Sequence, residues 1–249
     1  IYSGMVRFLH YQQILKFYKT CYGRDGLKDL QDELGGDLKK IVVGMFKTPL
    51  DYDTELIHSA MKGMGTDEEL LIEIICTSTP SHLEKIKARF EQLYGKTLES
   101  EIEDELSGDL KRLMISLLAA GKSDNEDVDT EKCDNDVKKL YEAGEGQWGT
   151  DETLFNKIFA LRSPAEIRYI NKAYSKYCGK TLYEVISDEF SGDIKKALKT
   201  IFNKKAVQWT AFHYRNDFLF ILRIVQSTGR NIHFGFAFVA GIVQFVASA

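Results

Sequence analysis

Proline is scarce in this chain, since only Pro49, Pro80 and Pro164 occur among its 249 residues. Each proline lies between two stretches with helical apolar spacing, at a point where the preceding residue is pushed out of the helical backbone region. The clearest apolar stripe follows Pro80 and consists of Leu83, Ile86, Phe90, Leu93 and Tyr94. No stretch shows the sustained apolar–polar alternation that is typical of a strand. The sequence therefore predicts an all-α fold.

Several functional classes lack their usual sequence signals. The net charge is −4 and no basic stripe with interleaved aromatic residues appears, so nucleic-acid binding is not expected. The motifs GxSxG, HExxH and the P-loop are missing and the five histidines form no spaced cluster, so we expect no enzyme and assign no catalytic residue. An EF-hand is not expected either, because Ser123–Asp129 (SDNEDVD) has no central glycine.

The four cysteines, at positions 21, 76, 133 and 178, show no CxxC spacing. In a chain of this length we expect reduced, packed cysteines rather than a disulfide framework, which favours the cytoplasm. Ile1–His10 contains no clean apolar run with a cleavage site, so no signal peptide is visible. The chain starts with Ile rather than Met, and its natural start is expected to lie upstream.

One segment occurs three times without an internal gap. It reads YGRDGLKDLQDELGGDLKK at Tyr22–Lys40, YGKTLESEIEDELSGDLKR at Tyr94–Arg112 and CGKTLYEVISDEFSGDIKK at Cys178–Lys196. The step from the second copy to the third is somewhat longer than the step from the first to the second. A recurrence of this kind predicts stacked helical units, here of about five helices each.

These units divide the chain. We predict a partial first unit at 1–48, a complete unit at 49–120, an acidic linker at 121–130, a complete unit at 131–205 and an unrelated tail at 206–249. The linker accounts for the longer second step. The partial unit keeps the last three helices, between Tyr11 and Phe46. In the first complete unit the helices are predicted at Tyr52–Lys62, Asp67–Thr77, Ser81–Tyr94, Thr97–Leu106 and Gly108–Ala119.

A glycine-rich loop accompanies both complete units and reads GMGTDEELL in one and GQWGTDETLF in the other. The spacing from Gly65 of the first loop to Glu105 is identical to the spacing from Gly149 of the second loop to Glu189. A loop paired at a fixed distance with one carboxylate indicates a repeated, oxygen-rich site. In the partial unit no such loop precedes Glu33.

The loop residues suit a hard cation. Glycines allow a loop to turn several carbonyl oxygens toward one point, and calcium takes six to eight oxygen ligands. Carbonyls of Met61, Gly63 and Gly65 with a bidentate Glu105 supply about five oxygens, which leaves places for water or for a lipid phosphate. The alternative that stays open is an ordinary helix–helix turn followed by a surface glutamate.

The residues after the loop resemble the start of a helix. Thr66 is followed three positions later by Glu69, which is the T-x-x-E pattern of a capping box. We therefore predict that Thr66 caps the helix that follows the loop.

The sequence resembles the annexin family in three motifs: KGMGTDE at Lys62–Glu68, GKTLESEIEDELSGDLKRL at Gly95–Leu113 and LYEAGEGQWGTDE at Leu140–Glu152. The resemblance covers Tyr11–Lys205 and fits the end of repeat one, all of repeat two, a longer linker and all of repeat three. It implies all-α, annexin-like repeats stacked in a slightly curved disc. The convex face of such a disc binds calcium and, through calcium, acidic phospholipid.

The resemblance also assigns residues. The calcium ligands that it implies are Met61, Gly63, Gly65 and Glu105 in repeat two, and Gly144, Gln147, Gly149 and Glu189 in repeat three. Glu33 occupies the position of the repeat-one carboxylate, but no complete site is expected there without a loop. The implied lipid contacts are Trp148, Lys62 and Met64. An indole suits the depth of the membrane interface, and a Trp148 packed against a neighbouring helix is the alternative.

Two departures from the family pattern stand out. The family commonly ends the second helix of a repeat with Arg, which Arg162 provides in repeat three, but Ser78 stands there in repeat two. The tail, Ala206–Ala249, has no counterpart in the repeats. It is a product of altered splicing or gene misprediction, a packing layer in place of repeat four, or a membrane anchor. For an anchor, Phe234–Ala249 is shorter than the roughly 20 apolar residues that a span needs.

Taken with the resemblance, the loops predict calcium-dependent, reversible and peripheral binding to acidic phospholipid membranes. Calcium is the expected cofactor, and the protein is expected to move from the cytoplasm to membranes when calcium rises. The competing hypothesis is a helical-repeat scaffold that binds a protein partner without metal.

Overall fold

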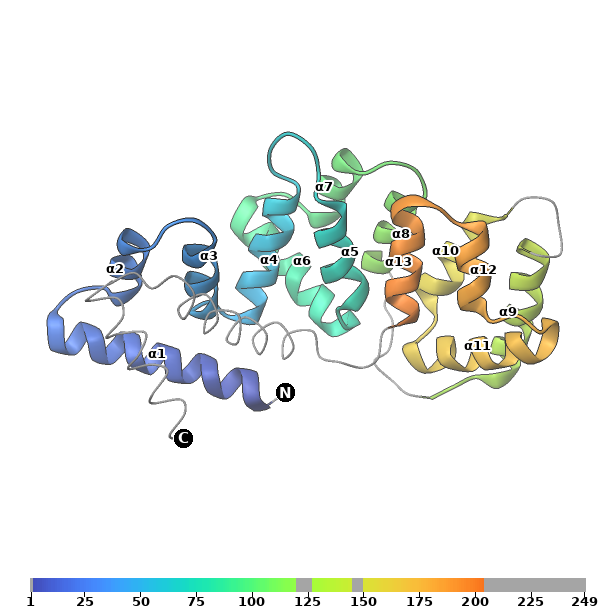
Figure 1. Ribbon diagram of the computed structural model, residues 1–249, viewed down its shortest axis with the longest axis horizontal. Helices are drawn as coiled ribbons and strands as arrows, with labels where there is room; N and C mark the ends of the chain where they lie inside the picture. The colour runs from blue at the N-terminus through green and yellow to red at the C-terminus, as the bar shows by residue number, and fades with distance from the viewer. Residues whose placement is uncertain (1, 120–126, 145–149, 204–249) are drawn as a thin grey trace, which may run out of the picture. The chain divides into compact units, whose positions relative to one another are not determined.

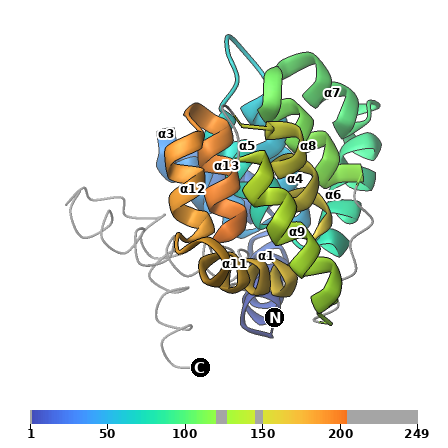
Figure 2. The same cartoon turned by 90° about the vertical axis from the view of Figure 1, so that its right-hand side faces the viewer.

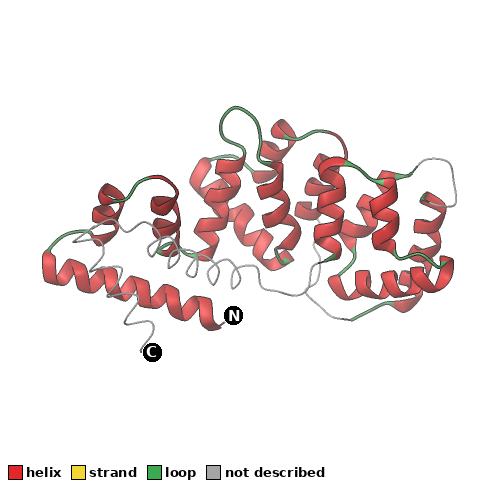
Figure 3. Ribbon diagram, viewed as in Figure 1, coloured by secondary structure: helices red, strands yellow, loops and turns green. Residues whose placement is uncertain are grey.

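The computed structural model describes residues 2–119, 127–144 and 150–203. Within these ranges the chain forms thirteen helices and no strand (Figures 1 and 3), which confirms the predicted all-α class. The chain divides into two compact units, one holding Ile1–Pro49 and the other beginning at Leu50. None of the helices described is long and apolar enough to cross a membrane. The predicted tail at 206–249 lies outside the described residues, as does most of the predicted linker.

The first unit contains α1 (Tyr2–Tyr22), α2 (Gly26–Glu33) and α3 (Gly36–Met45). Three helices were predicted between Tyr11 and Phe46, and α1 begins earlier than predicted, at Tyr2. Its small core includes Tyr11 and Phe46, whose ring centroids lie 5.4 Å apart. Glu33 is exposed at the end of α2.

The second unit contains two groups of five helices, as the repeat predicts. The repeat-two group comprises α4 (Pro49–Ala60), α5 (Glu68–Thr77), α6 (Pro80–Tyr94), α7 (Leu98–Glu105) and α8 (Gly108–Ala119). The repeat-three group comprises α9 (Thr130–Ala143), α10 (Glu152–Leu161), α11 (Pro164–Cys178), α12 (Leu182–Glu189) and α13 (Gly192–Phe202). The helices of repeat two lie close to their predicted ends.

Proline and glycine mark the ends of the third helix in both groups. Thr79 caps α6 with its side chain, Pro80 fills the first turn, and Gly95 ends the helix at a φ of 71°. Proline suits the first turn because the amide hydrogen it lacks would have no helical partner there, and glycine suits the left-handed backbone at the end. Ser163, Pro164 and Gly179 repeat the pattern in α11. The scarce prolines therefore start helices.

One hydrophobic core runs through both groups of the second unit. The groups meet along two seams, because α10 packs against α8 and α13 packs against α5 (Figures 1 and 2). Fully buried side chains fill the interior, among them Leu71, Ile75, Leu113, Phe155, Phe159 and Leu198. Repeats two and three are thus held together by shared apolar burial, the main favourable contribution to folding.

All four cysteines are free, and two of them, Cys76 and Cys133, are packed in the core as predicted. Cys76 and Cys133 are buried, Cys178 is half-buried and Cys21 is exposed. Burial raises the pKa of the Cys133 thiol to about 11, so this thiol is protonated at neutral pH.

A buried carboxylate is paired in both groups, but with different partners. Arg162, at the end of α10, donates from Nε to Oδ2 of the buried Asp136 in α9. The equivalent carboxylate in repeat two is Asp53 of α4, which accepts a hydrogen bond of 2.7 Å from Nε2 of His82 in α6. The Ser78 departure therefore concerns a real contact, and a histidine from the next helix takes the place of the arginine.

The first prediction is that Arg162→Ala lowers the free energy of unfolding by about 3 kcal/mol, because it leaves the buried Asp136 carboxylate without its cation. Urea denaturation followed by circular dichroism measures the change. The control is Arg168→Ala, which removes an exposed arginine from α11. Equal stability of the two variants would show that the Asp136–Arg162 pair does not support the fold.

Candidate functional site

The loop between α4 and α5 is closed by a backbone hydrogen bond of 2.8 Å from the amide of Asp67 to the carbonyl of Ala60. Gly63 and Gly65 have φ angles of 129° and 94°, which other residues rarely adopt. Met61 is buried at the start of the loop, while Met64 at its tip is fully exposed. Figure 1 shows this loop extending beyond the ends of the helices that it joins. The glycines thus build an extended loop anchored at both ends.

The loop contacts the predicted carboxylate. Glu105 is the last residue of α7 and is exposed. Its Oε2 accepts a hydrogen bond of 2.9 Å from the hydroxyl of Thr66, which follows the last loop glycine. The fold therefore brings the loop and Glu105 together, as their repeated spacing in the sequence led us to expect.

Repeat three has the same contact. The hydroxyl of Thr150 donates to Oε2 of Glu189 at 2.6 Å, and Glu189 is the last residue of α12. Its loop is closed by a bond of 2.8 Å from the amide of Asp151 to the carbonyl of Ala143. That loop has one residue more than the loop of repeat two. The contact between threonine and glutamate is therefore kept despite a longer loop.

The predicted ligands of repeat three are only partly described. Gly144 is buried after the end of α9. A side chain there would meet the backbone oxygen of Leu140 at 3.4 Å and the ring of Phe155 at 3.6 Å. Gln147, Trp148 and Gly149 lie outside the described residues.

The prediction that Thr66 caps α5 is wrong. Asp67 is the N-cap, and its carboxylate accepts from the amide of Leu70 at 3.0 Å. Asp151 caps α10 in the same way. The aspartate stands one residue closer to the helix and is as good a cap as threonine, so the hydroxyl of Thr66 is available to Glu105. The sequence signal was the TD pair that follows the glycine in both loops.

Side chains alone do not form a metal site in the described part of the chain, since no three His, Cys, Asp or Glu residues cluster there. Any cation at these loops therefore needs backbone carbonyl oxygens beside the one carboxylate. Oxygen-only ligand sets with carbonyls and a carboxylate suit calcium. The positive φ angles of Gly63 and Gly65 and the carboxylate held against the loop fit this requirement.

Comparisons with known proteins agree with this architecture. The family model described as Annexin matches residues 52–117 and 135–201. Annexin A13 of Mus musculus is 43% identical over 190 residues, which cover 76% of this chain and 60% of that protein. The chain thus spans about three fifths of the length of this relative.

Solved structures give the same result. The structure of annexin III matches with a TM-score of 0.73 and 30% identity, over 85% of this chain and 63% of that chain. The calcium-bound structure of annexin (Sm)1 matches with a TM-score of 0.66 and 25% identity, over 79% of this chain and 60% of that chain.

Proposed function

Because the chain belongs to the annexin family, we propose that it binds calcium at two loop sites and, through calcium, the surface of membranes that contain acidic phospholipid. The family as a whole is known for calcium-dependent phospholipid binding. For this chain, the proposal is carried by one observation, the glycine loop that contacts a helix-ending glutamate through a threonine in both complete repeats.

In repeat two the proposed ligands are the carbonyl oxygens of Met61, Gly63 and Gly65 with the carboxylate of Glu105. Calcium binds six to eight oxygens, so coordination places remain for water or for a phosphate oxygen of a lipid. A carboxylate oxygen has more than one lone pair, and Glu105 can therefore accept the hydroxyl of Thr66 while it binds the metal. In repeat three the proposed ligands are Gly144, Gln147, Gly149 and Glu189.

The charge of the protein supports a calcium requirement. The chain carries a net charge of −4, and an acidic membrane surface repels a protein of the same sign. A calcium ion between the loop and a lipid phosphate replaces that repulsion with attraction. Binding of this kind is peripheral and is reversed when calcium is removed.

The exposed tip of the repeat-two loop suits direct contact with lipid. Met64 is fully exposed and Lys62 is exposed beside it. A flexible apolar side chain can enter the interface, while the ammonium group of a lysine stays at the level of the phosphates. We propose the same contact for Trp148 in repeat three.

The second prediction concerns the carboxylates. Glu105→Gln and Glu189→Gln each raise the calcium concentration needed for half-maximal sedimentation with phosphatidylserine vesicles by about tenfold, since glutamine keeps the size but loses the charge. The matched control is Glu33→Gln, which changes the equivalent carboxylate of the partial repeat. If the double variant sediments like the control, the assigned ligands are wrong. Absence of sedimentation by the original protein at any calcium concentration would favour the protein-scaffold hypothesis instead.

The third prediction concerns the threonine. Thr66→Val weakens calcium binding at repeat two by about fivefold, because the lost hydrogen bond no longer orients Glu105. Thr66→Ser keeps a hydroxyl and should stay within about twofold of the original protein. Isothermal titration with calcium in the Glu189→Gln background isolates this site. Equal affinities for the valine and serine variants would contradict an orienting role for the hydroxyl.

The fourth prediction separates metal binding from lipid contact. Met64→Ser weakens vesicle binding at saturating calcium by about tenfold, because an apolar side chain no longer enters the interface. Calcium affinity without vesicles should not change, since only the carbonyl groups of this loop are proposed to bind the metal. An unchanged vesicle affinity would show that the loop tip stays outside the bilayer.

A further inference from the structure

The two seams of the second unit are built from equivalent positions. Residues of α5 and α8 recur at one constant offset along the chain in α10 and α13, so that Glu69 corresponds to Thr153 and Arg112 to Lys196. The α5–α13 seam and the α8–α10 seam therefore present the same backbone with different side chains. The side chains of the two seams can therefore be compared position by position.

The α5–α13 seam is bridged by an ion pair. Nζ of Lys196 in α13 lies 2.5 Å from Oε1 of Glu69 in α5. The same ammonium group also contacts Asp193 at 3.1 Å. At this seam the cation of one helix is neutralised by the facing helix.

The α8–α10 seam lacks this bridge. Arg112 stands at the position of Lys196, but the position of Glu69 is taken by Thr153. One turn further along, Lys157 of α10 replaces an acidic residue. Arg112 pairs with Asp109 of its own helix, and no ion pair links the described residues of α8 and α10. Arg112 and Lys157 thus stand on facing helices, and within the described residues neither pairs with a carboxylate of the other helix.

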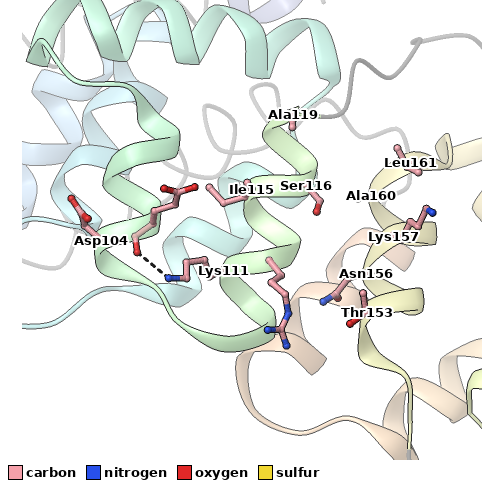
Figure 4. A pocket seen from close by; sticks show the side chains of 12 residues that line it. Asp104, Lys111, Ile115, Ser116, Ala119, Thr153, Asn156, Lys157, Ala160 and Leu161 are labelled. Atoms are coloured by element: carbon pink, nitrogen blue, oxygen red, sulfur yellow. Dashed lines mark hydrogen bonds between the residues drawn. The ribbon is translucent and has the colours of Figure 1, made fainter.

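This seam is open. A groove of about 860 Å³ lies between α7 and α8 on one side and α10 on the other (Figure 4). Figure 4 shows Nζ of Lys111 bonded to the carbonyl of Glu103, so this ammonium is tied to the wall. Ile115, Ala119 and Leu161 line the apolar part of the groove. A groove of this size accommodates a small organic ligand.

The α10 wall of the groove contains a buried polar side chain, whereas α5 has an apolar side chain at the equivalent position. Asn156 is 3% exposed, and so is Ile72 at the equivalent position of α5. Nδ2 of Asn156 donates to the carbonyl of Asp109 over a long 3.4 Å, and Oδ1 has no hydrogen-bond partner within the described structure. A buried amide without a partner is costly. The oxygen itself is enclosed, so it makes this wall more polar than the equivalent wall of α5 without facing a ligand.

We propose that the α8–α10 groove binds a phosphate monoester, with Arg112 and Lys157 on the phosphate. Arginine forms paired hydrogen bonds with phosphate oxygens. Glu103 and Asp104, which also line the groove, suit a hydroxyl or ammonium group on the same ligand. This site needs no calcium and is separate from the loop sites.

The groove lies next to both loop sites in the chain. Asp104 immediately precedes Glu105, and Thr153 lies one helical turn after Thr150. The phosphate monoester can therefore belong to a lipid headgroup at the membrane surface or to a soluble metabolite. Both sources present the same phosphate group to the groove, so separate experiments are needed to distinguish them.

The test uses O-phosphoserine and inorganic phosphate as soluble probes, in chelator and at constant ionic strength, with isothermal titration. The original protein should bind O-phosphoserine, and Arg112→Gln/Lys157→Gln should bind it at least about tenfold more weakly. Lys138→Gln/Lys139→Gln removes the same charge from exposed lysines of α9 and should bind normally. Absence of binding by the original protein, or an equal loss in both double variants, would overturn the proposal.

Thr153→Glu gives a sharper test. It places a glutamate opposite Arg112, as Glu69 stands opposite Lys196 at the α5–α13 seam. This variant should close the groove with an ion pair, keep or raise the melting temperature and lose binding of O-phosphoserine. Unchanged binding by this folded variant would overturn the proposal. Glu105→Gln/Glu189→Gln should bind the probe normally. The experiments can therefore contradict the groove proposal and the calcium-site proposal separately.

Vesicles distinguish the sources of the phosphate. Phosphatidylcholine vesicles that contain phosphatidic acid are sedimented with the protein in chelator. Retention that Thr153→Glu abolishes assigns the groove to a lipid headgroup, and binding of the soluble probe without retention assigns it to a soluble phosphate monoester. Retention that is the same in the original protein and in Thr153→Glu would overturn the assignment to lipid.

Discussion

A threonine hydroxyl donates to the carboxylate that ends the fourth helix in each complete repeat, and the candidate sites depend on this one contact. Without it, the glycine loop and the glutamate are an exposed turn and an exposed side chain, which need not meet. The contact depends in turn on Asp67 and Asp151, because these residues cap the following helix and leave the threonine to the glutamate. It is kept although the two loops differ by one residue. The contact at the carboxylate is thus the same in both repeats.

The sequence predicted the helices well and the contacts between them less well. Helix positions follow from local signals, such as Pro80 at the start of α6 and Gly95 at its end, and these signals act within one turn. The capping error at Thr66 arose between two adjacent residues that can both cap a helix. The pairing of Asp53 with His82 was not predicted, because it joins two helices and replaces an arginine by a residue from a different position. Contacts of this kind need the packed structure.

The internal duplication offers a comparison that one copy would not. Asp136 with Arg162 and Asp53 with His82 show that the fold requires a partner for a buried carboxylate at this position, since an unpaired buried charge is costly. The identity of that partner can change. The seams show a position where no partner is required. Lys196 and Glu69 form an exposed ion pair at the α5–α13 seam, and the α8–α10 seam has no such pair among the described residues. Because an exposed ion pair contributes little to stability, that position can change its chemistry without loss of the fold.

Burial therefore separates the side chains that hold the fold from the side chains that are proposed to contact calcium or lipid. Glu105, Glu189 and Met64 are exposed, so changing them removes little packing and should leave the helices intact. Asp136 and Arg162 are almost fully covered, and changing them tests stability. Asn156 in the groove wall is buried like a core residue, and its amide oxygen has no partner within the described structure. The equivalent position of the other repeat is Ile72, which is buried to the same extent.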